Sequence, residues 1–125
     1  MRILGIDYGK KKIGLAVATS KIAEPFMVLR VESFQEGVKK VTGIIEDERI
    51  EKIVIGISEG KMAEETRAFG KRVEEQANIP IVYQDETLST QQAQELSIEA
   101  GIGRKKRKSL EDAYSAAIIL QSYLD

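Results

Sequence analysis

The stretch that decides the fold runs from Arg2 to Ser20 and reads RILGIDYGKKKIGLAVATS. Its first part is an apolar run typical of a strand buried on both faces, and this run ends in a single carboxylate, Asp7. Gly9 can then turn the chain with a positive φ, and a second apolar strand covers Ile13 to Ala18. The stretch predicts a β-hairpin with Asp7 at its mouth and a basic tip made of Lys10, Lys11 and Lys12.

Asp7 needs an explanation, because acidic side chains are rarely buried without a partner. One interpretation is structural: an aspartate in a turn can end a strand. The other is functional: the carboxylate can be a ligand for a metal ion or for a water bound to a phosphate. The hairpin alone leaves both interpretations open.

Composition limits both the size of the protein and its chemistry. A chain of 125 residues with 42% hydrophobic residues suits a single domain, residues 1–125, with a single core. The sequence contains no cysteine and no histidine, which excludes thiol nucleophiles, disulfides and imidazole bases. Hydrolytic chemistry would therefore depend on carboxylates, hydroxyls, lysines or a metal ion held by oxygen ligands.

Charge is unevenly distributed along the chain. The net charge is only −1, so no global field steers the protein to an acidic polymer. Two dense basic clusters stand out nevertheless, Lys10–Lys12 and the run Arg104, Lys105, Lys106, Arg107 and Lys108. No apolar run approaches the length of a membrane span, and the N-terminus lacks the layout of a signal peptide. We expect a cytoplasmic protein with no membrane partner.

Periodicity predicts the remaining elements. Further strands are expected at Phe26–Val31, Ile53–Ile57 and Ile81–Tyr83. Helices are expected behind Ser33, over Met62–Ala77, from Ser89 to Leu96 and from Ser109 to Leu124. This order predicts an α/β fold with a mixed five-stranded sheet, in which three antiparallel strands are followed by two parallel ones, and helices on both faces.

Acidic residues gather at one predicted edge of this sheet. Sites in open α/β sheets form at the carboxyl ends of parallel strands, where Asp7 and the pair Asp85–Glu86 stand. Asp112 lies on the inward, apolar side of the last helix, although a capping role with Ser109 would also explain it. Converging carboxylates raise one another's pKa unless a cation neutralises them, and Mg²⁺ or Mn²⁺, as one or two ions, can do so.

Three motifs in order resemble the YqgF/RuvX family of small RNase H-like proteins. They are GIDYGKKKIGLAV at residues 5–17, DETLST at residues 85–90 and EDAYSAAIILQSYL at residues 111–124. Family members are described as Holliday junction resolvases and as pre-16S ribosomal RNA nucleases. The resemblance implies an RNase H-like fold and a divalent-metal-dependent endonuclease, acting in rRNA processing during ribosome biogenesis or in junction resolution.

The resemblance also implies the metal ligands and catalytic residues, which are Asp7, Glu86 and Asp112. Asp85 is the alternative to Glu86, because adjacent strand residues point to opposite faces and the pattern alone does not choose between them. The sequence departs from the family at Thr87, where an arginine is usual, and in the loop Gly56–Gly60, which is usually rich in proline. Both departures bear on the identity of the substrate.

The basic clusters fit nucleic acid as the partner. Lys10–Lys12 adjoin Asp7 and Arg104–Lys108 precede the helix of Asp112, so both can contact phosphates, although such runs are often plain solvated loops. The alternative functions are a catalytically silent nucleic-acid-binding protein and an ATP-binding relative of the actin and sugar-kinase group, which the small size disfavours. A homodimer would suit a symmetric four-way junction.

Overall fold

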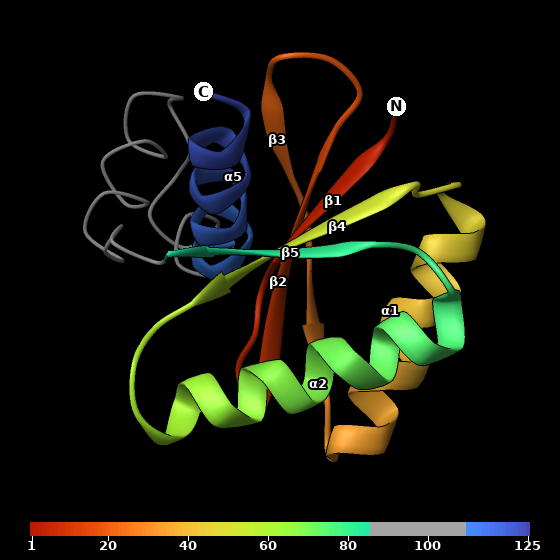
Figure 1. Ribbon diagram of the computed structural model, residues 1–125, viewed down its shortest axis with the longest axis vertical. Helices are drawn as coiled ribbons and strands as arrows, with labels where there is room; N and C mark the ends of the chain where they lie inside the picture. The colour runs from red at the N-terminus through yellow and green to blue at the C-terminus, as the bar shows by residue number, and fades with distance from the viewer. Residues whose placement is uncertain (86–109) are drawn as a thin grey trace.

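The computed structural model describes residues 1–85 and 110–125 (Figure 1). The strands are β1 (Ile3–Asp7), β2 (Lys12–Ala18), β3 (Ala23–Arg30), β4 (Lys52–Ile57) and β5 (Ile81–Asp85). The helices are α1 (Phe34–Asp47), α2 (Lys61–Ala77) and α5 (Glu111–Leu124). The predicted helix at Ser89–Leu96 and the basic run at Arg104–Lys108 lie outside the described residues.

The strands form the mixed sheet that the sequence predicts. Their order is β3-β2-β1-β4-β5, with β1–β2 and β2–β3 antiparallel and β1–β4 and β4–β5 parallel. In Figure 1, α1 and α2 lie on one side of the sheet and α5 on the other. The predicted fold class, a five-stranded α/β sheet covered on both faces, is therefore confirmed. No helix in the described ranges is long and apolar enough to cross a membrane.

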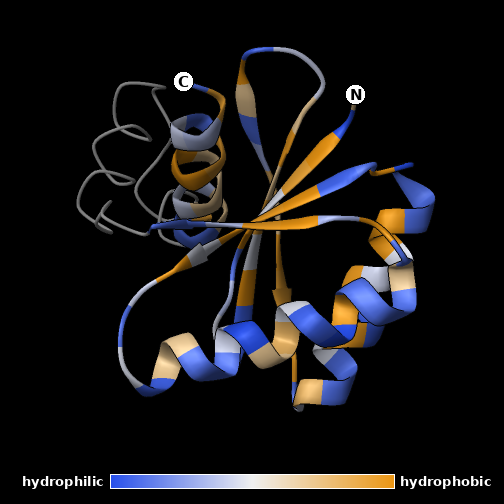
Figure 2. Ribbon diagram, in the orientation of Figure 1, coloured by the Kyte–Doolittle hydropathy of each residue, from blue (hydrophilic) through white to orange (hydrophobic). Residues whose placement is uncertain are grey.

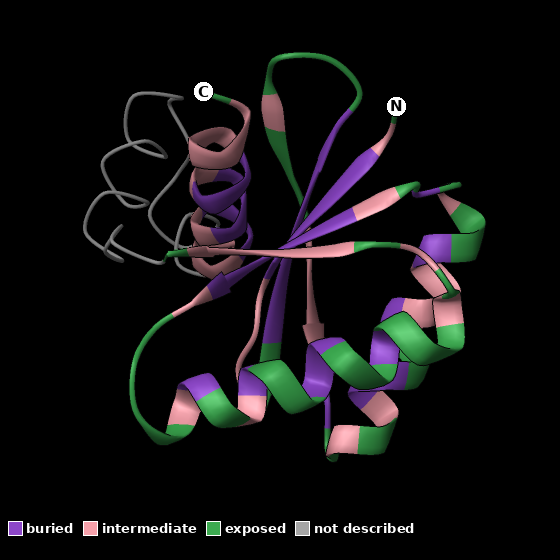
Figure 3. Cartoon of the chain, viewed as in Figure 1, coloured by how far each residue is buried: buried purple, intermediate pink, exposed green. Residues whose placement is uncertain are grey.

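Two apolar layers hold the helices to the sheet. On the first face Leu4, Ile6 and Leu15 pack with Val41 of α1 and Phe69 of α2, all fully buried. The second face is smaller and joins β1, β2 and β4 to α5. The central strands are largely orange in the hydropathy view (Figure 2) and largely purple in the burial view (Figure 3), while the outer surfaces of α1 and α2 are mostly blue and green. Strand alternation thus assigns even residues of β1 to one layer and odd residues to the other.

Helix α5 lies unusually close to the sheet, because small residues line the face beneath it. A Cβ atom added to Gly5 would lie 2.7 Å from Leu120 Cβ, and one added to Gly14 would lie 1.9 Å from the backbone oxygen of Asp112. Contacts this short are impossible for real side chains. The first turn of α5 is therefore seated directly on β2 at Gly14.

Strand β3 begins three residues earlier than the predicted Phe26–Val31 and contains Pro25, which the sequence places in a turn. Proline is tolerated because β3 is an edge strand, where a missing N–H costs no ladder hydrogen bond. The register shifts at this point: Ala16 pairs with Pro25 but Leu15 pairs with Met27, so Phe26 is the extra residue of a β-bulge.

Polar side chains near the end of α5 form hydrogen bonds with β3, with β5 and with the turn before β3. Gln121 accepts a hydrogen bond from the Ala23 backbone N–H at 2.9 Å and donates one to the Lys21 carbonyl at 2.9 Å. Ser122 accepts a hydrogen bond from Gln84 on β5 at 3.2 Å. Gln121 and Ser122, both half-buried, therefore tie the end of α5 to the sheet.

The close approach at Gly14 generates a stability prediction. Gly14→Ala should destabilise the protein by about 2–3 kcal/mol, because the new methyl group overlaps backbone that side-chain rotation cannot move. Gly43→Ala in α1 is the matched control: nothing lies within 4 Å of its added Cβ, and alanine in a helix should gain roughly 0.5–1 kcal/mol. Urea unfolding midpoints measure both. A Gly14→Ala variant as stable as the parent would mean that α5 is not seated on β2 as described.

Candidate functional site

Asp7 and Asp112 come together on the face of the sheet covered by α5. Asp7 ends β1 and shares strand parity with Ile3 and Gly5, which both contact α5. Its Cα partner on β2 is Gly14, the residue on which Asp112 rests. An added Cβ on Gly14 would lie 2.9 Å from Asp112 Cβ, so two acidic residues 105 positions apart in sequence both adjoin one glycine.

Both carboxylates are half-buried at the carboxyl end of β1. The helix-capping interpretation of Asp112 requires Ser109 to begin the helix. Instead α5 begins at Glu111 and its N-cap is Leu110, whose side chain makes no capping hydrogen bond, while Ser109 lies outside the described residues. The first-turn position of Asp112 still favours a negative charge, because the positive end of the helix dipole lies there.

Asp85 is placed differently. Ile81 and Tyr83, which share its parity on β5, pack in the layer of α1 and α2, whereas Gln84 bonds to Ser122 of α5. Alternation therefore directs Asp85, which is exposed, to the face opposite Asp7 and Asp112. Glu86 lies outside the described residues, as do Arg104, Lys105, Lys106, Arg107 and Lys108.

Two adjacent carboxylates suit a hard divalent cation, since Mg²⁺ is commonly held by one or two carboxylates together with substrate phosphates. Within residues 1–85 and 110–125 no group of three or more acidic side chains is close enough to hold a metal ion. Of the three predicted ligands, Asp7 and Asp112 are the two that lie within the described ranges, and they lie at the same edge of the sheet.

The lysines at the hairpin tip are exposed, as a phosphate-binding role requires. Lys10 lies toward α2, where its Nζ is 4.0 Å from Oε1 of Glu65. Tyr8, between Asp7 and the lysines, stacks on Phe69 with ring centroids 4.5 Å apart and donates a hydrogen bond to Glu65. Sequence reasoning missed Glu65, because helical periodicity marks its neighbour Thr66 as inward and carries no signal for an acid beneath the hairpin.

Burial and the neighbouring Glu65 carboxylate, with the hydrogen bond between them, raise the pKa of Tyr8 from 10.0 to about 12. Oε2 of Glu65 is buried and has no hydrogen-bond partner in the described part of the chain. The negative carboxylate therefore opposes ionisation of the phenol, and the neutral phenol anchors the hairpin to α2.

This pKa shift generates a pH prediction. A folded-state pKa above the unfolded value contributes stability below pH 10 that is lost as the pH rises toward 12. The free energy of unfolding of the parent should therefore fall between pH 10 and 12, and the fall should be smaller in Tyr8→Phe, which has no phenol to ionise there. Urea titrations at several pH values measure this difference. Identical pH slopes for parent and variant would show that Tyr8 is not held neutral by Glu65.

Comparison with known proteins shows the family to which the chain belongs. A family model described as RuvX, Holliday junction resolvase, matches residues 1–125. A protein of Caldanaerobacter subterraneus subsp. tengcongensis named "Putative pre-16S rRNA nuclease" is 41% identical over 134 residues, covering 100% of this chain and 96% of that one. A protein of Natranaerobius thermophilus with the same name is 38% identical over 133 residues, with 100% and 94% coverage.

Solved structures share the fold at lower identity. The chain resembles T. thermophilus RuvC in complex with a Holliday junction substrate, with a TM-score of 0.66, 18% identity, and coverage of 98% of this chain and 94% of that one. It resembles the fowlpox virus Holliday junction resolvase with a TM-score of 0.66, 16% identity and coverage of 99% and 98%. Since the family model matches from end to end and relatives exceed 30% identity over the whole chain, this chain belongs to the RuvX family of nucleases.

Proposed function

We propose that the chain is a divalent-metal-dependent endonuclease that cleaves a phosphodiester bond in structured nucleic acid at the edge marked by Asp7 and Asp112. The observation that supports the proposal is the position of Asp7 and Asp112, which both adjoin Gly14 at the carboxyl end of a strand that pairs in parallel with β4. Membership of the RuvX family supplies the reaction class.

Asp7, Asp112 and Glu86 would hold one or two Mg²⁺ or Mn²⁺ ions. When bound, the metal would supply Lewis-acid chemistry and offset negative charge on the phosphodiester in the transition state. We prefer Glu86 to Asp85 as the third ligand because the parity of β5 directs Asp85 to the other face of the sheet. The preference also follows the family resemblance.

The residues of the chain itself position the substrate. Lys10–Lys12 extend from the hairpin that carries Asp7, and together with Arg104–Lys108 they would neutralise phosphates on either side of the scissile bond. Few aromatic side chains are available to stack on bases, since aromatics make up 6% of the sequence. We therefore propose that the substrate is recognised through its backbone and shape.

The two candidate substrates are the 5′ precursor of 16S ribosomal RNA and the four-way DNA junction. The first follows from the names of the full-length relatives, and the second from the description of the family. We place the RNA first, because those relatives are the more similar in sequence. A homodimer would present two such sites to a symmetric junction.

Carboxylate substitutions test the site. Asp7→Asn, Asp112→Asn and Glu86→Gln should each lower the cleavage rate by at least about a hundredfold, because even residues behind metal ligands cost tenfold to a hundredfold. Asp85→Asn is the matched control and should stay within about threefold of the parent. The assay measures Mg²⁺- or Mn²⁺-dependent cleavage of precursor RNA and of a four-way junction. Full activity in Asp7→Asn would refute the proposed site.

Metal binding can also be measured without cleavage. Mg²⁺ or Mn²⁺ should stabilise the parent by roughly 1.4 kcal/mol when the free ion is about ten times its Kd. Asp112→Asn should gain much less, because asparagine is tolerated at the start of a helix but is a poorer ligand for a hard cation. Thermal melts with and without the ion measure the gain, with Asp47→Asn at the far end of α1 as the control. Equal gains in all three proteins would make these acids structural.

A further inference from the structure

Two cations face each other across β2 and β3. Lys12 and Arg30 are direct Cα partners in the antiparallel register, so their side chains leave the same face with Cβ atoms about 5 Å apart. Like charges placed directly opposite each other destabilise a sheet. The β-bulge at Phe26 creates this pair, because an unbroken register from Ala16 and Pro25 would place Leu29 opposite Lys12.

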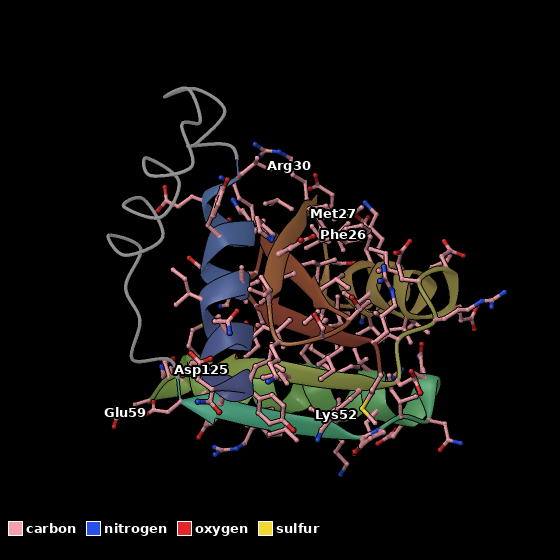
Figure 4. All side chains as sticks on the ribbon, turned by 90° about the horizontal axis from the view of Figure 1, so that it is seen from above. Phe26, Met27, Arg30, Lys52, Glu59 and Asp125 are labelled. Carbon is pink, nitrogen blue, oxygen red and sulfur yellow. The ribbon has the colours of Figure 1, made fainter. Side chains whose placement is uncertain are left out.

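The pair lies on the face that carries Asp7 and Asp112. Lys12 has the strand parity of Gly14, on which Asp112 rests, and lies two residues, about 7 Å, before it at the start of β2. Figure 4 shows Arg30 at the end of β3, on the side where α5 begins. The two cations and the two carboxylates thus share one surface at one edge of the sheet.

Neither cation is neutralised by an acid in the ranges 1–85 and 110–125, where no ion pair includes Lys12 or Arg30. Two other lysines near these cations do form ion pairs. Lys10 pairs with Glu65 at 4.0 Å, and Lys40 pairs with Glu36 at 3.2 Å. Lys10 and Lys40, on the side of α1 and α2, therefore have acidic partners, whereas Lys12 and Arg30 have none in these ranges.

The backbone beneath Arg30 is held in place. Lys40 donates a hydrogen bond from Nζ to the Arg30 carbonyl at 3.1 Å, and the next residue, Val31, donates its N–H to the Lys11 carbonyl at 2.9 Å. These bonds fix the last residue of an edge strand that would otherwise fray. Two exposed cationic side chains thus extend from an ordered base.

We propose that Lys12 and Arg30 form a phosphate clamp that binds one backbone phosphate of the nucleic acid beside the phosphodiester held at Asp7 and Asp112. The planar guanidinium of Arg30 can donate two parallel hydrogen bonds to one phosphate, and the Lys12 ammonium adds a point charge. A phosphate between them turns a repulsive cross-strand pair into an attractive triplet. The clamp rests on the proposed function and adds Arg30 to it.

A different explanation makes a different prediction. Charged side chains on an edge strand prevent two sheets from joining edge to edge, and β3 is such a strand. If that were the only role of Arg30, its neutralisation would increase self-association and leave the affinity for nucleic acid unchanged. The two explanations are therefore separated by one binding measurement together with a measurement of molecular mass.

The test compares Lys12→Gln and Arg30→Gln with two matched controls. The controls are Lys21→Gln and Arg72→Gln. Lys21 lies in the turn at the opposite end of β2, and Arg72 lies on the exposed surface of α2, on the other side of the sheet. Fluorescence anisotropy with a labelled four-way DNA junction and a labelled 16S precursor RNA, both without divalent metal, gives Kd across a salt series. Each clamp variant should weaken binding by roughly threefold or more and reduce the salt slope by about one, while the controls match the parent.

A charge reversal sharpens the test, because it moves stability and binding in opposite directions. Lys12→Glu places an acid opposite Arg30, so the melting temperature should rise while affinity falls by more than in Lys12→Gln. Clamp variants with unchanged Kd and salt slope would overturn the clamp, and continued metal-dependent cleavage by the parent would leave the proposed function intact. A parent that binds neither probe would overturn both.

Discussion

The close seating of α5 on the sheet is the constraint on which the rest of the structure depends. At Gly5 and Gly14 no side chain would fit between helix and strand, so backbone packing sets how closely α5 lies against β1 and β2. That fixed seating sets the first turn of α5 against the end of β1. Asp7 and Asp112 thus acquire their common position from backbone packing, which is more rigid than any contact between two carboxylates.

The two faces of the sheet differ in the residues that they bury. The layer of α1 and α2 contains the large side chains that stabilise the domain, such as Phe69 and Leu4. It also holds the acid partners of Lys10 and Lys40. The layer of α5 is smaller, and glycines on β1 and β2 let the helix approach the strands closely. One face thus contains most of the large core side chains, and the other places Asp7 and Asp112 at the same edge of the sheet.

The sequence predicted the sheet, its strand directions and the position of Asp7, because apolar runs and turn residues determine those features locally. It also indicated Asp112, since an acid on an apolar helical stripe is conspicuous. The register between β2 and β3 could not be predicted in this way. The bulge at Phe26 determines which residue lies opposite Lys12, and no local sequence pattern indicates a bulge. Arg30 was missed for that reason. The start of β3 was missed because proline in an edge strand and proline in a turn look alike in sequence.

The most direct measurement of the central claim is paramagnetic broadening of backbone NMR signals by substoichiometric Mn²⁺. An ion held by Asp7 and Asp112 should broaden the amides of Tyr8, Gly14 and Ala113 first, because these residues adjoin the two acids. Broadening at all three would place the ion between separate parts of the chain. The amides around Asp47, an exposed acid at the far end of α1, should remain sharp. Broadening that begins at Asp47 and spares Gly14 and Ala113 would contradict the account.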